Sequence, residues 1–83
     1  MGAYVFLLKE FEDDEKVTYR FGPNEDSMGK IQLNKITRKF TEIEPILDSS
    51  ISTKFYFDRA AQRLSVCFVR ENSVFPDRTT FES

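Results

Sequence analysis

The sequence predicts an α+β domain, with an antiparallel sheet of about four strands and one C-terminal helix packed on a face. Short runs of alternating apolar residues fill the first half of the chain, and charged or turn-forming residues separate them. One later segment repeats its apolar residues at helical spacing. A chain of 83 residues can bury one modest core, so we expect a single domain over residues 1–83.

The first predicted strand covers residues 3–11. Val5 and Leu7 occupy one alternation and Phe6 and Leu8 the other, so the run is apolar on both faces. Such a pattern is typical of a strand in the middle of a sheet.

Two hairpins complete the predicted sheet. Four consecutive acids at residues 12–15 repel one another and favour a solvated turn, after which alternation resumes over residues 17–21. Turn-forming residues at 22–27 end that strand. Residues 30–33 and 40–44 then alternate and predict the second hairpin.

The architecture depends on residues 53–71, which fit two interpretations. As a helix, the segment places six apolar residues on one stripe: Phe57, Ala60, Ala61, Leu64, Cys67 and Phe68. Ser52 is then the N-cap and Asn72 the left-handed terminator. As two strands, residues 54–58 would pair with 64–69 and give an all-β meander. The central Arg-Ala-Ala-Gln-Arg is a poor hairpin loop and a good helix centre, which favours the helix.

Several segments carry a family resemblance: Tyr19-Arg20-Phe21, Gly29 to Lys35 followed by Phe40, Tyr56 to Ala60 with Leu64, and Phe75-Pro76-Asp77. Together they resemble a group of short uncharacterised bacterial proteins. The resemblance implies three or four strands, then one helix, then a short tail with a Phe-Pro step. It implies no activity, so it bears on the fold alone. In that tail we expect Phe75 and Phe81 to pack over the domain.

The composition removes the usual catalytic groups. The chain has no His, which is the commonest general base and imidazole metal ligand. Cys67 is the single thiol, so one chain can form neither a disulfide nor a Cys-rich zinc site, and its apolar neighbours predict a buried, inert thiol. The acidic run lacks the spacing of a calcium loop, and no Gly-rich phosphate loop is present. We therefore expect a protein that is not an enzyme, with no catalytic residues, cofactor or metal.

The sequence also indicates where the protein resides. No stretch is long and apolar enough to span a bilayer, and no basic region precedes the opening run at residues 1–8. Phe6 stands where a myristoylation motif needs Ser or Thr. With one free Cys, the chain is expected to be cytoplasmic and without membrane contact.

The formal net charge of −2 conceals a basic segment at residues 30–39. Lys30, Lys35, Arg38 and Lys39 lie there without an acid between them, and a hairpin carrying them could contact phosphates. Four such charges on an acidic protein are few for a nucleic-acid domain, and lysines also protect edge strands. Weak nucleic-acid binding through this hairpin is therefore the alternative function.

The aromatic residues exceed what a small core needs, with nine Phe and three Tyr in the chain. Phe55, Tyr56 and Phe57 are consecutive, so they cannot all face one core. Either at least one is exposed or buried by another chain, or Tyr56 is simply half buried on its own chain. Protein interfaces favour such residues. We therefore expect a non-catalytic protein that associates with itself as a homodimer, or with another protein, through a sheet edge or through these three residues.

Overall fold

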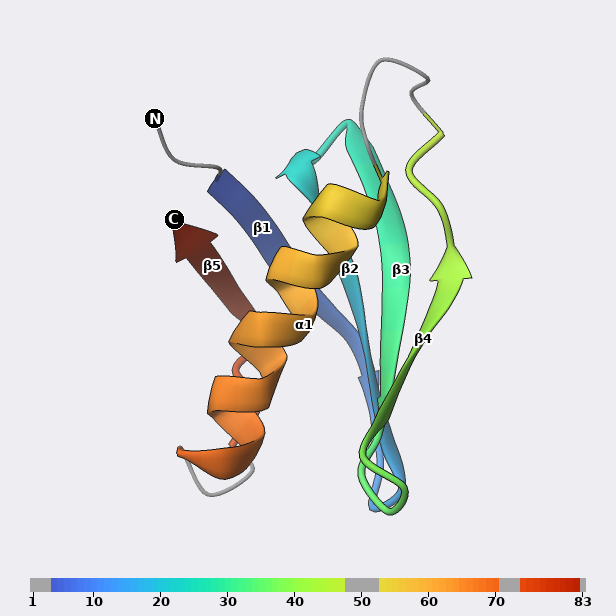
Figure 1. The fold of residues 1–83 in the computed structure, drawn as a ribbon, viewed down its shortest axis with the longest axis vertical. Helices are drawn as coiled ribbons and strands as arrows, with labels where there is room; N and C mark the ends of the chain where they lie inside the picture. Colours follow the sequence, from blue (N-terminus) through green and yellow to red (C-terminus); the bar gives the residue numbers. More distant parts are fainter. Residues whose placement is uncertain (1–3, 48–52, 71–73, 83) are drawn as a thin grey trace.

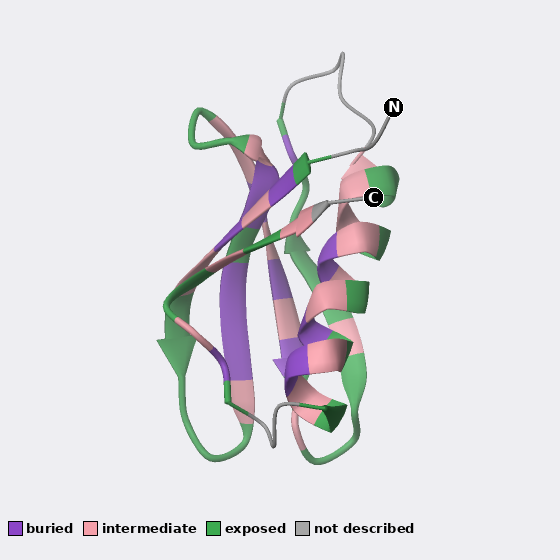
Figure 2. Ribbon diagram, turned by 90° about the vertical axis from the view of Figure 1, so that its left-hand side faces the viewer, coloured by how far each residue is buried: buried purple, intermediate pink, exposed green. Residues whose placement is uncertain are grey.

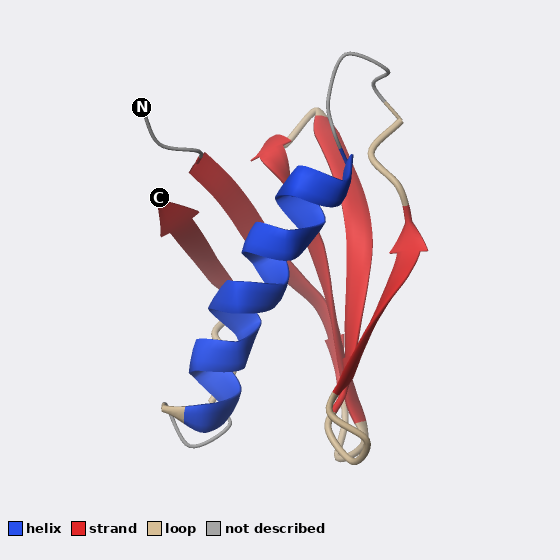
Figure 3. Cartoon of the chain, viewed as in Figure 1, coloured by secondary structure: helices blue, strands red, loops and turns tan. Residues whose placement is uncertain are grey.

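The computed structural model describes residues 4–47, 53–70 and 74–82 of the chain. These residues form five strands and one helix (Figure 1): β1 (Tyr4–Glu12), β2 (Lys16–Asn24), β3 (Ser27–Asn34), β4 (Lys39–Glu44), α1 (Thr53–Val69) and β5 (Arg78–Glu82). All neighbouring strands run antiparallel, in the order β4-β3-β2-β1-β5. The helix lies across one face of this sheet (Figure 3), which confirms the predicted α+β class.

The sheet has one strand more than the four that the sequence predicts. Residues 78–82, which we expected to be part of a packed tail, form β5 and pair with β1 from Leu8↔Arg78 to Tyr4↔Glu82. A strand of five residues offers too few alternations to stand out in the sequence. Because β5 occupies the edge, β1 lies inside the sheet, as its two-sided apolar pattern predicts.

The segment that fits two interpretations is helical over Thr53–Val69, so the alternative of an all-β meander is wrong. Within α1, the buried residues Ala60, Leu64 and Cys67 follow one another at spacings of four and three, which aligns them on the face toward the sheet. Cys67 is fully buried, as expected for a structural thiol. The predicted helix ends, Ser52 and Asn72, lie outside the described residues.

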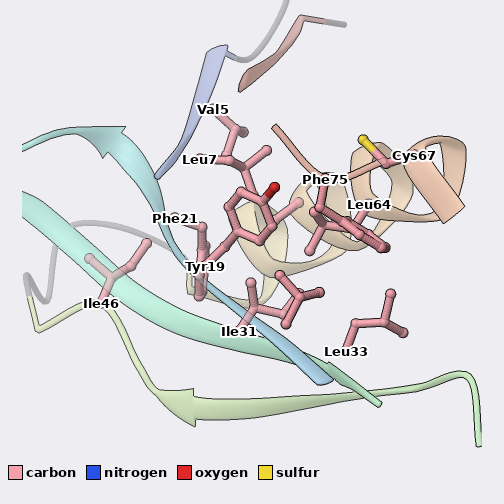
Figure 4. Close-up of a cluster of buried hydrophobic side chains, with 12 residues drawn as sticks. Val5, Leu7, Tyr19, Phe21, Ile31, Leu33, Ile46, Leu64, Cys67 and Phe75 are labelled. Carbon is pink, nitrogen blue, oxygen red and sulfur yellow. The ribbon is translucent and has the colours of Figure 1, made fainter. Parts of the chain in front are cut away.

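We call the face of the sheet under α1 the inner face, and the opposite one the outer face. Alternate residues of β1, β2 and β3 point to the inner face, and seven apolar ones among them are buried there: Val5, Leu7, Val17, Tyr19, Phe21, Ile31 and Leu33. Figure 4 labels six of these side chains, all except Val17, and shows them in one cluster with Leu64 and Cys67 of α1. The ring of Phe57 packs edge-on against Phe21, with centroids 5.9 Å apart.

A glycine in β3 allows the chain to pass from β4 toward the helix. A Cβ on Gly29 would lie 2.5 Å from the carbonyl oxygen of Glu44, because the segment after β4 crosses directly over this residue. The crossing carries Ile46 into the core, where it is 5% exposed. The hydroxyl of Thr53 accepts a hydrogen bond from the Ile46 amide at 3.1 Å, which fixes the crossing segment to the start of α1.

The chain between α1 and β5 is held by two side chains of the sheet. Lys9 donates a hydrogen bond from its ammonium to the carbonyl of Phe75 at 2.9 Å, and its amide donates to the carbonyl of Asp77 at 2.7 Å. The phenol of Tyr19 donates to the carbonyl of Pro76. Phe75 itself is buried in the core, as predicted. These contacts direct the chain toward the open edge of β1, where β5 then forms.

The carboxylate of Glu12 links Lys9, which holds residues 75 and 77, to Lys35 in the turn between β3 and β4. Glu12 accepts hydrogen bonds from Lys9 at 2.8 Å and from Lys35 at 2.7 Å, and Lys35 also donates to the carbonyl of Asp13. Burial raises the pKa of the Glu12 carboxyl, but hydrogen bonds from Lys35 and Lys9 outweigh it and hold this pKa below its ordinary value. The hydrogen bond to Glu12 in turn raises the pKa of Lys9.

Replacing Tyr19 with Phe is expected to lower the free energy of unfolding by about 1–3 kcal/mol, because the Pro76 carbonyl loses its donor inside the protein. Burial raises the pKa of the Tyr19 phenol, so the hydroxyl remains a donor at neutral pH. The measurement is denaturant unfolding. Tyr4→Phe, at a ring that is 41% exposed, is the control and is expected to change stability by less than about 0.5 kcal/mol. Equal losses in both variants would contradict this role of Tyr19.

Replacing Glu12 with Gln is expected to reduce stability at pH 7 by about 1 kcal/mol, the scale of partly exposed ion pairs. Since the pKa of Glu12 is lowered on folding, its contribution is present above the ordinary value of 4.5 and is lost as pH falls through the folded value. Unfolding measured from pH 7 to pH 3 should therefore show the wild type and Glu12→Gln converging in acid. A difference that stays constant over this range would contradict the assignment. Glu42→Gln, on the exposed edge strand, is the control.

Candidate functional site

An apolar stripe lies on the outer face of the sheet. No described helix or strand packs on that face, since α1 lies on the opposite side (Figure 2). On β1 the stripe consists of Tyr4, Phe6, Leu8 and Phe11, which we call the outer stripe. Tyr4 is 41% and Phe11 48% exposed, while Phe6 and Leu8 are half-buried. The rings of Tyr4 and Phe6 pack edge-on with centroids 4.8 Å apart, so they form a joint surface.

A β-bulge places Phe11 on this face. Strict alternation from Val5 and Leu7 would send Phe11 inward, but the pairing with β2 shifts register between Lys9 and Phe11. Phe11 consequently pairs with Thr18, whose hydroxyl accepts a hydrogen bond from Gln32. The bulge thus extends the outer stripe along the whole of β1.

A shallow pocket of about 310 Å³ lies beside the stripe. Phe6 and Leu8 supply its apolar lining, and the remaining lining comes from Glu25, Arg78, Thr79 and Thr80. Arg78 and Glu25 approach to 3.9 Å with both side chains largely exposed, so this ion pair contributes little to stability. The pocket is at the small end of the range for ligand sites, but it can receive one side chain of a partner.

The turn that carries Glu25 reaches the pocket because of a second glycine. Gly22 lies on β2 directly opposite Phe6 of β1. A Cβ at this position would lie only 2.0 Å from the carbonyl oxygen of Ser27, because the turn folds back over it. Where the turn folds back, the pairing of β2 with β3 shifts register between Phe21 and Asn24. β2 therefore ends at Asn24 and not at residue 21, where the sequence predicts its end.

Charged residues border the outer stripe mostly as opposite pairs. The ammonium of Lys30 lies 3.1 Å from a Glu10 carboxylate oxygen and 3.9 Å from one of Glu44. Arg20, which pairs with Leu8 across the strands, is exposed. The outer face therefore combines an apolar centre with a polar rim of both signs.

The predicted contact residues of α1 divide between the core and the surface. Phe57 packs against Phe21, and both Phe57 and Tyr56 lie half-buried against the core. Phe55 is 39% exposed, and the guanidinium of Arg59 lies 4.7 Å from its ring centroid. The three residues therefore do not form one exposed cluster.

The predicted phosphate-contacting residues are also separated. Lys30 lies on the outer face between two carboxylates, as described above. Lys35 is bound to Glu12, and its ammonium lies 5.3 Å from the ring centroid of Phe75. Arg38 is exposed, with its guanidinium 5.4 Å from the ring centroid of Phe68, and Lys39 is exposed on β4. The four side chains thus divide between the two sides of the sheet.

Arg38 occupies a backbone conformation that normally favours glycine. Its φ of 63° lies in the left-handed region, where the turn between β3 and β4 closes with a hydrogen bond from the Arg38 amide to the carbonyl of Asn34. The side chain of Asn34 caps the same turn by accepting from the amides of Ile36 and Thr37. Contact with Phe68 accounts for a long cationic side chain in place of glycine here.

The outer stripe is not among the sites that the sequence predicts. Its signal is the two-sided apolar alternation of residues 3–11, which by itself indicates only a central strand. The bulge at Phe11 could not be read from alternation, because it depends on the pairing with β2.

Neither a metal site nor a membrane-spanning helix is found among the described residues. None of the acidic and Cys side chains there form a group of three or more that could hold a metal ion. The single described helix, α1, is not long and apolar enough to cross a membrane. Comparison with models of known protein families, with curated proteins and with solved structures finds no match. Function is therefore inferred from the geometry of this chain.

Replacing Gly22 with Ala is expected to displace the turn over the outer face, because the added methyl group cannot occupy space 2.0 Å from the Ser27 carbonyl oxygen. The expected loss is about 1–3 kcal/mol of unfolding free energy, the scale of overpacking. Two-dimensional NMR should show the largest amide shifts in residues 23–28. Asp26→Ala, in the same exposed turn, is the control and should leave stability nearly unchanged. Shifts confined to residue 22 would contradict this description of the turn.

Proposed function

We propose that the protein is a non-catalytic association module that binds a protein partner, either a second copy or another chain, through the outer stripe of β1. One observation carries the proposal. The sequence of β1 is apolar on both sides, but α1 covers only the inner side. A strand with this composition is normally covered on both faces. The missing cover is what a partner would supply.

The dimensions of the outer stripe support this function. From Tyr4 to Phe11 a strand extends about 23 Å at roughly 3.3 Å per residue, which fits one side of a protein interface. Three of its four residues are Tyr or Phe, which protein interfaces favour. Arg20 and Arg78 lie beside the stripe, and interfaces also favour arginine. The pocket next to Phe6 offers a place for an anchoring side chain of the partner.

The charges around the outer stripe favour a protein over a nucleic acid. Because Lys30 lies between Glu10 and Glu44, its charge is compensated locally. Lys35 is likewise bound to Glu12. Binding would then be driven by apolar burial at the stripe and would change little with ionic strength, in contrast to phosphate binding.

Site-specific photo-crosslinking tests the proposal. A photoreactive phenylalanine analogue in place of Phe11, which is 48% exposed, should yield a discrete adduct with a second protein or a second copy in cells. The same analogue in place of Ile36, which is 71% exposed in the turn between β3 and β4, is the matched control and should yield little. Excess unlabelled wild-type protein should suppress the Phe11 adduct. Equal labelling from both positions, or none from Phe11, would contradict the proposal.

A further inference from the structure

We infer that β5 is a self-recognition edge, at which a second copy of this chain adds its own β5 antiparallel to form a continuous sheet across a two-fold axis at Thr80. This goes beyond the proposed function, because the free edge of β5 is a surface separate from the outer stripe of β1.

The free side of β5 meets the requirements for strand addition. Within the described residues β5 has a single neighbour, β1, and Figure 1 shows it at the margin of the sheet. Its pairing with β1 runs without a register shift over all five residues. The middle residues, Thr79 to Phe81, are uncharged and of high strand propensity. Unpaired backbone groups on such an edge are a template for another strand.

The sequence of β5 is self-complementary in the antiparallel direction. When Thr80 lies opposite Thr80 of the second copy, Thr79 lies opposite Phe81, and Arg78 lies opposite residue 82, a glutamate. The two-fold axis repeats each pairing, so the arrangement contains two sets of opposite charges. Opposite charges directly across a strand pair are favourable and like charges are unfavourable. The side chain of Arg78 is 77% exposed and therefore accessible for this contact.

The other edge of the sheet is less suited to strand addition. β4 contains a bulge at Ile43, because Lys30 pairs with Glu44 while Ile31 pairs with Glu42. Three of its six residues are charged, and Pro45 follows directly. Bulges, charges and proline are the features by which natural sheets block edge pairing. β5 has none of these in its centre.

Edge pairing would also enlarge the proposed binding surface. A two-fold axis perpendicular to the sheet leaves both outer faces on the same side. Each pocket beside Phe6 includes Thr80 in its lining, so the two pockets would flank the seam between the copies. A five-residue strand pair buries little area, which places the dimer at the weak end of specific interfaces, below about 1,200 Å². The dimer should therefore form reversibly with concentration.

The test uses two charge reversals, Arg78→Glu and Glu82→Arg, in sedimentation equilibrium from micromolar to millimolar protein. Each variant alone places like charges opposite each other twice in a homodimer, so each should dimerise roughly tenfold more weakly than wild type. In an equimolar mixture of the two variants, the heterodimer again has a positive residue facing a negative one at both pairs, so association should recover. The double variant Arg78→Glu/Glu82→Arg should also dimerise like wild type, because the charges are exchanged but still opposite. It lacks the ion pair between Arg78 and Glu25.

The corresponding pair at the other edge, Lys39→Glu and Glu44→Lys, is the matched control and should change dimerisation little. Amide NMR spectra of each variant establish that it is folded. Recovery in the mixture and the double variant, without an effect at β4, supports the inference. A wild type that remains monomeric at millimolar concentration overturns it, as does a dimer insensitive to the β5 reversals or one that follows the β4 reversals. Photo-crosslinking from Phe11 reports on the outer stripe independently of all these outcomes.

Discussion

The structure depends on one constraint: a single helix can cover only one face of a five-stranded sheet. The inner face receives α1, and its apolar residues form the core with Tyr19 and Phe21 fully buried. The outer face receives no described element, although β1 contributes apolar residues to it as regularly as to the core. Burial of apolar surface is the main driving force of folding and of association alike. The uncovered side of β1 is therefore where the fold and the proposed function meet.

The same constraint gives importance to the short segment between α1 and β5. Lys9 and Tyr19 donate hydrogen bonds to the backbone carbonyls of three consecutive residues, Phe75 to Asp77. These bonds direct the chain back to the sheet. Without β5, β1 would be an edge strand, with its outer face uncovered and one side of its backbone unpaired. β5 covers the backbone of β1 but transfers the open edge to itself. Anchoring of residues 75–77 thus determines which strand lies at this edge of the sheet.

Sequence patterns accounted for most of the fold because its largest elements have long, regular repeats. The buried stripe of α1, ending at Cys67, and the alternation of β1 to β4 required no knowledge of tertiary contacts. β5 was not predicted, since its position depends on hydrogen bonds from Lys9 and Tyr19, which are distant in sequence. The candidate site was predicted less well. Consecutive aromatics at Phe55 to Phe57 suggested exposure, whereas packing against Phe21 and Arg59 absorbs much of their surface, and a bulge that depends on strand pairing directs Phe11 outward.

The central claim is that β1 is covered by its own chain on one side only. Leu7 and Leu8 are adjacent and chemically identical, but Leu7 is fully buried on the inner face and Leu8 is half-buried on the outer face. The most direct measurement is the broadening of their methyl NMR signals by a soluble gadolinium chelate in dilute protein. The account predicts strong broadening at Leu8 and little at Leu7. Equal protection of both leucines would show that another part of the chain covers the outer face, and would contradict the account.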